Sequence, residues 1–400
     1  MQPPQHDSGL ITPKATDLLR LYPNGGSLFT SPRRTILTLG RHATLAHGPA
    51  DTLAHRAAQL LRQAQAEGLV QPILLGAIPF NAQAPAHLFI PESTVQGRGA
   101  GEAGLQTQTE NKTLRDISSE ALPHPDRYRD NVAQALSQID EGGLDKVVLS
   151  RSIKVDANIA VPSLLQRLAN RNPCGYTFAI DLPAADGERR TLVGASPELL
   201  LSRRGKQVVS HPLAGSIPRS SDPAEDTRRA EHLFGSAKDR HEHQLVVDAV
   251  VAALGPYCDA VHVPSGPSLV STPSMWHLAT EIRGDLADEA CSALELALAL
   301  HPTPAVCGHP TAAARSFIET VEGFDRGFFT GLVGWCDASG DGEWAVTIRC
   351  AEVGEHTATL YAGAGIVAGS EPHLELAETS AKLRTMLSAM ALESVLEGTI

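Results

Sequence analysis

The sequence predicts an α+β fold, in which clusters of antiparallel strands are separated by helices. Apolar runs gather near residues 146–155, 192–215 and 326–365, and turn residues join neighbouring runs within each group. Helical spacing of apolar residues marks the segments between these groups. Strict alternation of strand and helix, which would favour a doubly wound parallel sheet, is absent.

The first 25 residues are rich in proline and weakly periodic, so we expect a loose tail before a single domain over residues 26–394. Residues 95–120 also lack a period and predict a mobile loop. The other elements expected in this half are a helix over 50–67, a buried strand over 72–79 and an amphipathic helix over 125–142.

Residues 222–254 predict a long helical segment, which Ser236 and Asp239 restart with a capping box. The region 326–365 predicts three strands, and the second continues past Val346 so that Thr347 and Arg349 share one face. Further helices are expected over 289–300, 311–321 and 377–390.

The composition excludes several classes of protein. The net charge is -12, from 33 basic and 45 acidic side chains, and no Lys/Arg-rich run appears, which argues against a nucleic-acid partner. The N-terminus lacks the apolar core of a signal peptide, and no stretch is long enough to span a membrane. The six cysteines form no C-x-x-C pair, so we expect reduced thiols in the cytoplasm.

Charged residues of the C-terminal helix form one candidate site. Glu375, Glu378 and Lys382 are three and four residues apart and therefore share a helical face. Spacing alone favours a solvated face, but the preceding strand ends in a Gly363-Ala364-Gly365 segment that lets a ligand approach backbone amides. Two carboxylates with ligand oxygens and waters are a usual environment for Mg²⁺.

Other charged residues are isolated within apolar segments. In His241-Glu242-His243 the two histidines point in nearly opposite directions on a helix, so they cannot chelate one metal, whereas Glu242 can face inward. Arg349 lies within an apolar strand and can receive a carboxylate. Lys146 and Glu198 each stand at the edge of an apolar run, where a surface position is the simpler interpretation.

A series of motifs resembles the chorismate-utilising enzymes, with core motifs over residues 125–390. Two further segments, LLGAIPF at 74–80 and FIPES at 89–93, resemble the siderophore-type isochorismate synthases of that family. The core motifs, in order, are KVVLSR at 146–151, GASPE at 194–198, PLAGS at 212–216, KDRHEH at 238–243, WHLAT at 276–280, HPTPA at 301–305, GLVGWC at 331–336, TIRC at 347–350, GAGIV at 363–367 and ETxxK at 378–382.

The resemblance implies two stacked antiparallel sheets with outer helices and an active site in a central cleft. It implies Lys146 as general base and Glu198 as general acid. It also implies that Glu242 and Glu378 bind Mg²⁺, with Glu375 in or beside the metal's ligand shell. The positions implied to contact or line the substrate site are Gly215, Ser216, His277, Ala305, Arg349, Gly363 and Lys382.

The implied reaction converts chorismate to isochorismate. The ring hydroxyl is a poor leaving group and needs an acid, so Glu198 must hold a proton near neutral pH. Attack by water needs a base, so Lys146 must act as a neutral amine. The expected enzyme is a cytoplasmic monomer that needs no glutaminase subunit and serves siderophore synthesis.

Several alternatives remain. A salicylate synthase shares the Lys and Glu, and Ala305, Val306 and Tyr361 could shift the product. A menaquinone-pathway isochorismate synthase, or an anthranilate or aminodeoxychorismate synthase component, belongs to the same family. An inactive chorismate-binding protein would be expected to have lost at least one charged position. An unrelated metal hydrolase lacks a supporting ligand spacing.

Overall fold

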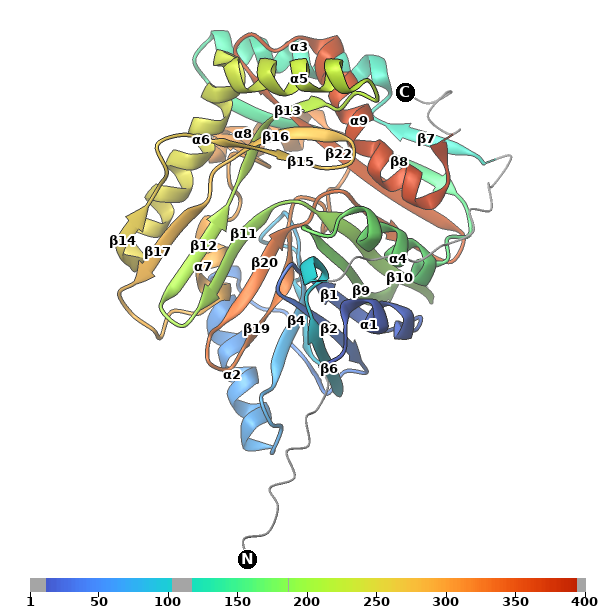
Figure 1. Cartoon of the computed structure of the whole chain (residues 1–400), viewed down its shortest axis with the longest axis vertical. Coiled ribbons are helices and arrows are strands. Elements are labelled where there is room, and N and C mark those ends of the chain that lie inside the picture. Colours follow the sequence, from blue (N-terminus) through green and yellow to red (C-terminus); the bar gives the residue numbers. More distant parts are fainter. Residues whose placement is uncertain (1–11, 103–116, 186, 394–400) are drawn as a thin grey trace, which may run out of the picture.

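Two large antiparallel sheets stack as a sandwich, with a small third sheet at one end (Figure 1). The computed structural model describes residues 12–102, 117–185 and 187–393. Helices cover the outer faces of the sandwich, which confirms the expected α+β class and the two stacked sheets.

The strands are arranged in three sheets. The first sheet has the order β18 (Gly308–His309), β8 (Lys146–Asp156), β22 (Thr357–Val367), β21 (Cys350–Val353), β10 (Glu188–Ser196), β9 (Tyr176–Ala185), β1 (Ser27–Thr30), β2 (Arg34–Leu39) and β6 (Ser93–Arg98), and β7 (Ser119–Leu122) also pairs with β8. The second has the order β14 (Cys258–His262), β17 (Ile282–Leu286), β12 (Gln207–His211), β11 (Leu199–Arg204), β20 (Gly342–Val346), β19 (Leu332–Asp337), β4 (Ile73–Ile78), β5 (His87–Ile90) and β3 (Ala43–Thr44). The third consists of β13 (Leu213–Pro218), β16 (Met275–Ala279) and β15 (Ser268–Ser271).

The helices alternate with these strands along the chain. They are α1 (Ala15–Leu21), α2 (Leu53–Ala66), α3 (Pro125–Asp140), α4 (Val161–Arg171), α5 (Pro223–Gly235), α6 (Ala237–Leu254), α7 (Ala293–Leu300), α8 (Thr311–Val321) and α9 (Pro372–Met390). Short 3-10 turns lie at Ala50–Thr52, Ala100–Glu102 and Gly255–Tyr257.

The main core lies between the two large sheets. Phe29 and Phe178 from the first sheet pack in one cluster with Phe89 and Trp335 from the second. The outer face of the first sheet packs against α1, α4 and α9, and the outer face of the second against α2, α6 and α7. Burial on both faces explains why the central strand β4 is buried throughout and shows no polar alternation.

Most predicted elements are confirmed, among them α2, α3, β4, β8 and α8. The restart of the long helical segment is also confirmed, because the Ser236 hydroxyl accepts a hydrogen bond from the Asp239 amide at 3.2 Å.

Two predictions of irregular structure are wrong in part. Within the expected tail, Ala15–Leu21 form α1 and bury Leu18 and Leu19; this two-turn helix is too short to show a period. Within the expected loop 95–120, residues to Arg98 belong to β6, an edge strand with mostly exposed side chains and hence no apolar alternation. Residues 1–11 and 103–116 lie outside the described residues.

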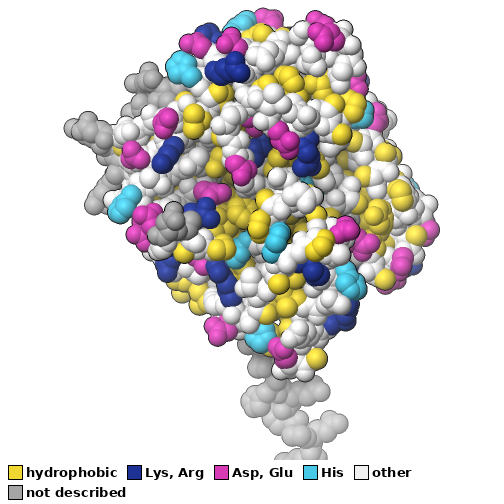
Figure 2. Space-filling model, turned by 180° about the vertical axis from the view of Figure 1, so that it is seen from behind, with side chains coloured by type: hydrophobic (Ala, Val, Ile, Leu, Met, Phe, Trp, Pro, Cys, Tyr) yellow, Lys and Arg dark blue, Asp and Glu magenta, His cyan; other side chains and the backbone are white. Residues whose placement is uncertain are grey.

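The surface carries both charges. On the face shown in Figure 2, basic and acidic side chains are interspersed. Among the described residues, no helix is long and apolar enough to cross a membrane.

Candidate active site

A cavity lies where the open end of the sandwich meets the third sheet and α9. Its lining includes Val148 from β8, Tyr361 from β22, Ser216 from β13 and Lys382 from α9. The cavity holds about 60 Å³ of accessible space, and about 610 Å³ when all empty space around it and the solvent at its mouth are counted.

Glu198 is the buried carboxyl group of this cavity. It follows β10 at the point where the chain crosses from the first sheet to β11 of the second, and it is 2% exposed. Burial raises the pKa of Glu198 to about 7, although the Leu213 amide and the cations of Lys146, Arg349 and Lys382 oppose this rise. The side chain can therefore be protonated near neutral pH.

Lys146 supplies a buried amine beside the same cavity. It begins β8, is fully buried, and its Nζ lies 2.9 Å from Oε1 of the cavity-lining Glu242. Burial acts to raise the pKa of Glu242, but the Lys146 ammonium outweighs burial and holds that pKa below its usual value. A side chain on Gly365 would meet Glu242 and would lie 2.9 Å from Lys146 Cε, so glycine there leaves room for the pair.

Arg349 reaches the cavity from a break between strands. The prediction that the strand through Val346 continues past Arg349 is wrong: β20 ends at Val346 in the second sheet, and β21 begins at Cys350 in the first. Arg349 has φ 50°, a left-handed conformation that interrupts a strand. Four strands therefore replace the predicted three, and the chain crosses between sheets where Arg349 lines the cavity.

Ser216, His277 and Arg349 form a row of polar contacts in the cavity wall. Ser216 Oγ lies 2.7 Å from His277 Nδ1, and His277 Nε2 lies 3.4 Å from Arg349 Nη2. Burial, followed by the cations of Arg349 and Lys382, holds the pKa of His277 well below its usual value, so the imidazole is neutral.

Helix α9 brings Lys382 to the cavity and Glu378 beside it, on the shared helical face that their spacing predicted. Lys382 Nζ pairs with Glu378 Oε1 at 2.5 Å and donates to the Gly363 carbonyl at 2.9 Å. One turn earlier, Glu375 pairs with Lys238 Nζ at 3.0 Å. Burial, and then the charge of Glu378, raise the pKa of Glu375 to about 7.

Three other predicted positions, Gly215, Ala305 and Gly363, line the cavity, whereas Lys146, Glu375 and Glu378 are not among its lining residues. Gly215 has φ 76°, which a residue with a side chain rarely adopts. Of the two histidines flanking Glu242, His241 is exposed and His243 is buried against Thr280, so the prediction that they cannot share a metal is confirmed.

Sequence reasoning missed a buried pair behind the cavity, Glu322 and Arg326. Arg326 donates to both Glu322 carboxylate oxygens, to the carbonyls of Val148 and Val306, and to the Thr330 hydroxyl. Because Val148, Val306 and Thr330 line the cavity, this pair fixes its wall. The i,i+4 spacing of an acid and an arginine was the available signal.

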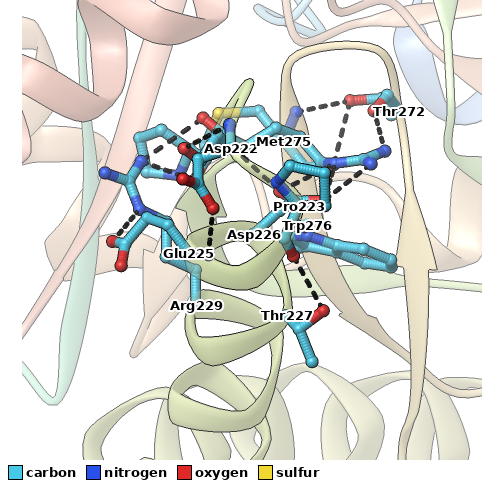
Figure 3. A network of polar contacts seen from close by, with 12 residues as sticks. Asp222, Pro223, Glu225, Asp226, Thr227, Arg229, Thr272, Met275 and Trp276 are labelled. Atoms are coloured by element: carbon cyan, nitrogen blue, oxygen red, sulfur yellow. Dashed lines mark hydrogen bonds and ion pairs between the residues drawn. The ribbon is translucent and has the colours of Figure 1, made fainter.

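A second network, shown in Figure 3, fastens the third sheet to α5. Asp226 accepts hydrogen bonds from Arg219 Nη2 at 2.7 Å, the Ser220 amide at 2.9 Å and Trp276 Nε1 at 3.1 Å. These bonds, led by those from Arg219, lower the pKa of Asp226 to about 2. The network holds the ends of β13 and β16 together next to Ser216 and His277.

The chain is similar to known proteins along most of its length. A family model described as chorismate binding enzyme matches residues 55–391. The isochorismate synthase DhbC of Bacillus subtilis is 49% identical over 97% of this chain and 100% of its own length. The vibriobactin-specific isochorismate synthase of Vibrio cholerae is 45% identical over 83% of each chain. The crystal structure of DhbC from Bacillus anthracis superposes with a TM-score of 0.88 at 48% identity, covering 94% of this chain and 99% of that one. The chain thus belongs to the chorismate binding enzyme family and groups there with the isochorismate synthases.

Proposed function

We propose that the chain is an isochorismate synthase that isomerises chorismate by adding water at one ring carbon and expelling the ring hydroxyl from another. One observation carries the proposal: Glu198, a carboxyl group that can be protonated, lines the cavity, and the amine of Lys146 lies directly behind the same wall, paired with the cavity-lining Glu242 and close enough to lower the pKa of Glu198. The same cavity contains Arg349 and Lys382, two cations that suit a substrate with two carboxylates.

Glu198 acts as the general acid. Hydroxide leaves a carbon atom slowly, so the departing oxygen needs a proton in the transition state. A carboxyl group with a pKa of about 7 combines a populated acidic form with enough acidity to transfer its proton at neutral pH.

Lys146 acts as the general base on the attacking water. It is buried beside Glu242, and its ammonium must lose a proton before it can accept one from water. The proton released by water then resides on Nζ, the proton given by Glu198 leaves with the hydroxyl group, and the overall composition of the substrate is unchanged.

Arg349 and Lys382 orient the substrate. Arg349 Nε is buried and, among the described residues, has no hydrogen-bond partner, so it is available to a carboxylate. Lys382 is anchored by the Gly363 carbonyl and Glu378. Fixing both carboxylates holds the ring between acid and base, which converts attack by water into a positioned step.

The acidic residues of α6 and α9 fit a magnesium ion. Glu242 and Glu378 would hold it, with Glu375 in or beside its shell; each of these carboxylates also pairs with a lysine. No three acidic, histidine or cysteine residues in the described part of the chain cluster tightly enough to form a full metal site. Substrate and water oxygens would complete the shell, as Mg²⁺ prefers. The ion would neutralise the ring carboxylate and polarise the diene.

The proposed role is siderophore synthesis in the cytoplasm, by a monomer without a glutaminase subunit. The identity to DhbC and to a vibriobactin-specific synthase supports that pathway over a menaquinone one. All six cysteines are free thiols, which fits a reducing compartment.

Product analysis tests the proposal. Purified protein is incubated with chorismate and Mg²⁺, and the products are separated by chromatography, with a chelator added in a parallel reaction. Isochorismate alone, lost on chelation, is expected. Salicylate with pyruvate would establish a salicylate synthase instead, and unchanged chorismate would indicate an inactive binding protein.

A further inference from the structure

His277 links the two hydrogen-bond donors Arg349 and Ser216, and its bonding directions follow from its neighbours. A guanidinium group only donates hydrogen bonds. His277 Nε2, 3.4 Å from Arg349 Nη2, must therefore accept and carries no hydrogen. A neutral imidazole has one N–H group, which then lies on Nδ1.

The fixed tautomer determines what Ser216 can offer a ligand. His277 Nδ1 donates to Ser216 Oγ across 2.7 Å. The serine hydroxyl hydrogen therefore needs an acceptor other than His277, and Ser216 lines the cavity. Arg349 Nε is also buried and unpaired among the described residues. Two cavity-lining side chains joined by one imidazole thus each keep a donor hydrogen that can be offered to a ligand.

We propose that His277 is a positioning residue that couples Arg349 to Ser216, so that both donate hydrogen bonds to a substrate carboxylate. This inference rests on the proposed function for the identity of the substrate. His277 itself transfers no proton in it, because both of its ring nitrogens are engaged by side chains.

The neighbouring framework is built to hold this geometry. Ser216 and His277 are directly paired across β13 and β16. The Asp226 carboxylate binds Trp276, the residue before His277, and Arg219, just beyond the end of β13 (Figure 3). The guanidinium of Arg219 also lies 4.6 Å from the Trp276 ring centre.

Two isosteric amide variants separate the two bonds of His277. In His277→Asn the amide occupies the Nδ1 position and keeps the bond to Ser216. In His277→Gln it reaches the Nε2 position, and only the bond to Arg349 remains. Chorismate affinity is measured by calorimetry with Mg²⁺ in a Glu198→Gln background, which lacks the proposed acid, so that binding is read without turnover.

Ser216→Ala and His277→Gln are each expected to weaken chorismate binding about tenfold to a hundredfold, the range for one hydrogen bond to a charged group. The double variant should bind no more than about threefold more weakly than Ser216→Ala, because the two residues act as one unit. His277→Asn keeps the bond to Ser216 but loses the bond to Arg349, so it should also bind chorismate more weakly than the unsubstituted His277 protein. Ser274→Ala, which removes a bonded hydroxyl from the same hairpin outside the cavity, should leave the affinity unchanged.

Full affinity of either the Asn or the Gln variant, or losses that multiply in the double variant, would overturn the coupling. The proposed function is tested separately, by measuring product formation in protein that keeps Glu198. Isochorismate without the coupling pattern rejects only the role of His277. The coupling pattern without isochorismate rejects only the proposed reaction.

Discussion

Two buried ion pairs lie beside the cavity, and they differ in how many further hydrogen bonds they make with the protein. In the Glu322–Arg326 pair, Arg326 donates hydrogen bonds from Nε, Nη1 and Nη2 to carboxylate, carbonyl and hydroxyl oxygens. Glu322 also accepts the Ser150 amide at 2.7 Å. In the Lys146–Glu242 pair, one 2.9 Å contact joins the two side chains.

The difference shows what each pair contributes. A buried ion pair stabilises a fold only when further hydrogen bonds satisfy its remaining donors and acceptors. The Glu322–Arg326 pair meets that condition and can hold the cavity wall rigid. The Lys146–Glu242 pair retains donors and acceptors that can bind water, substrate or a cation. It therefore stabilises the fold little, but its groups remain free to take part in the reaction.

Removing the chemical groups should have the largest effect. Lys146→Ala and Glu198→Ala are each expected to lower kcat at least ~100-fold, the scale of a positioned base or acid. The rate of isochorismate formation measures the loss. Lys154→Ala, at an exposed position on the same strand β8, should retain full turnover; near-normal turnover of Lys146→Ala would remove its assignment.

Breaking the structural pair should act on stability instead. Arg326→Met removes the cation and leaves the Glu322 carboxylate buried and unpaired, and about 3–5 kcal/mol of unfolding free energy should be lost. Denaturant unfolding followed by fluorescence measures the change. Arg315→Met is the matched control, because Arg315 also lies over the Phe80 ring but is more exposed. Equal stability of the two variants would show that the additional bonds of Arg326 contribute nothing.

Glu198 should lower the unfolding free energy as pH rises from 4.5 to 7, a range in which its buried carboxyl group is still protonated and can act as an acid. Its folded pKa of about 7 exceeds the reference value of 4.5, so the folded state binds the proton more tightly. Its contribution to stability is therefore complete below pH 4.5 and is lost as pH rises through 7. Glu198→Gln should gain stability relative to the wild type over that window, measured by unfolding at several pH values. In the wild type, kcat should fall by up to about tenfold for each pH unit above 7, because Glu198 loses the proton that it donates.

The smallest effect is expected at Asp226, which acts on the cavity from a distance. Asp226→Asn weakens the bonds that hold β13 to β16, and it should raise the KM for chorismate by less than the roughly 100-fold that a 1 Å displacement of catalytic groups can cause. The pKa of Asp226 is lowered to about 2, so its stabilising effect is present above pH 4 and is lost as pH falls through 2. Melting temperatures of wild type and variant should therefore converge over that range.

Sequence reasoning worked best for long segments in which apolar residues recur regularly because one face is buried. The helical spacing of α3 and α9 and the apolar run of β8 predicted these elements and the shared face of Glu378 and Lys382. The motif resemblance placed Lys146 and Glu198 in one site, which periodicity alone could not do because β8 and the segment after β10 meet only through the folded sheets.

The missed features depend on contacts distant in sequence. The break at Arg349 follows from the strand changing sheets, and its apolar neighbours hide that change. β6 is recognisable only from its pairing with β2. Thr330 has φ 59° and donates its amide to the Thr347 carbonyl, and no local signal marks such a position. These features shape the cavity, so they are the part of the site that tertiary packing determines.

The most direct test of the account is the origin of the new hydroxyl oxygen. The enzyme is incubated with chorismate and Mg²⁺ in ¹⁸O-labelled water, and the isochorismate formed is examined by mass spectrometry. Water activated by Lys146 while Glu198 protonates the departing hydroxyl predicts one labelled oxygen in each product molecule. Unlabelled isochorismate would contradict the account, because the original hydroxyl would then have moved within the substrate without a base-activated water.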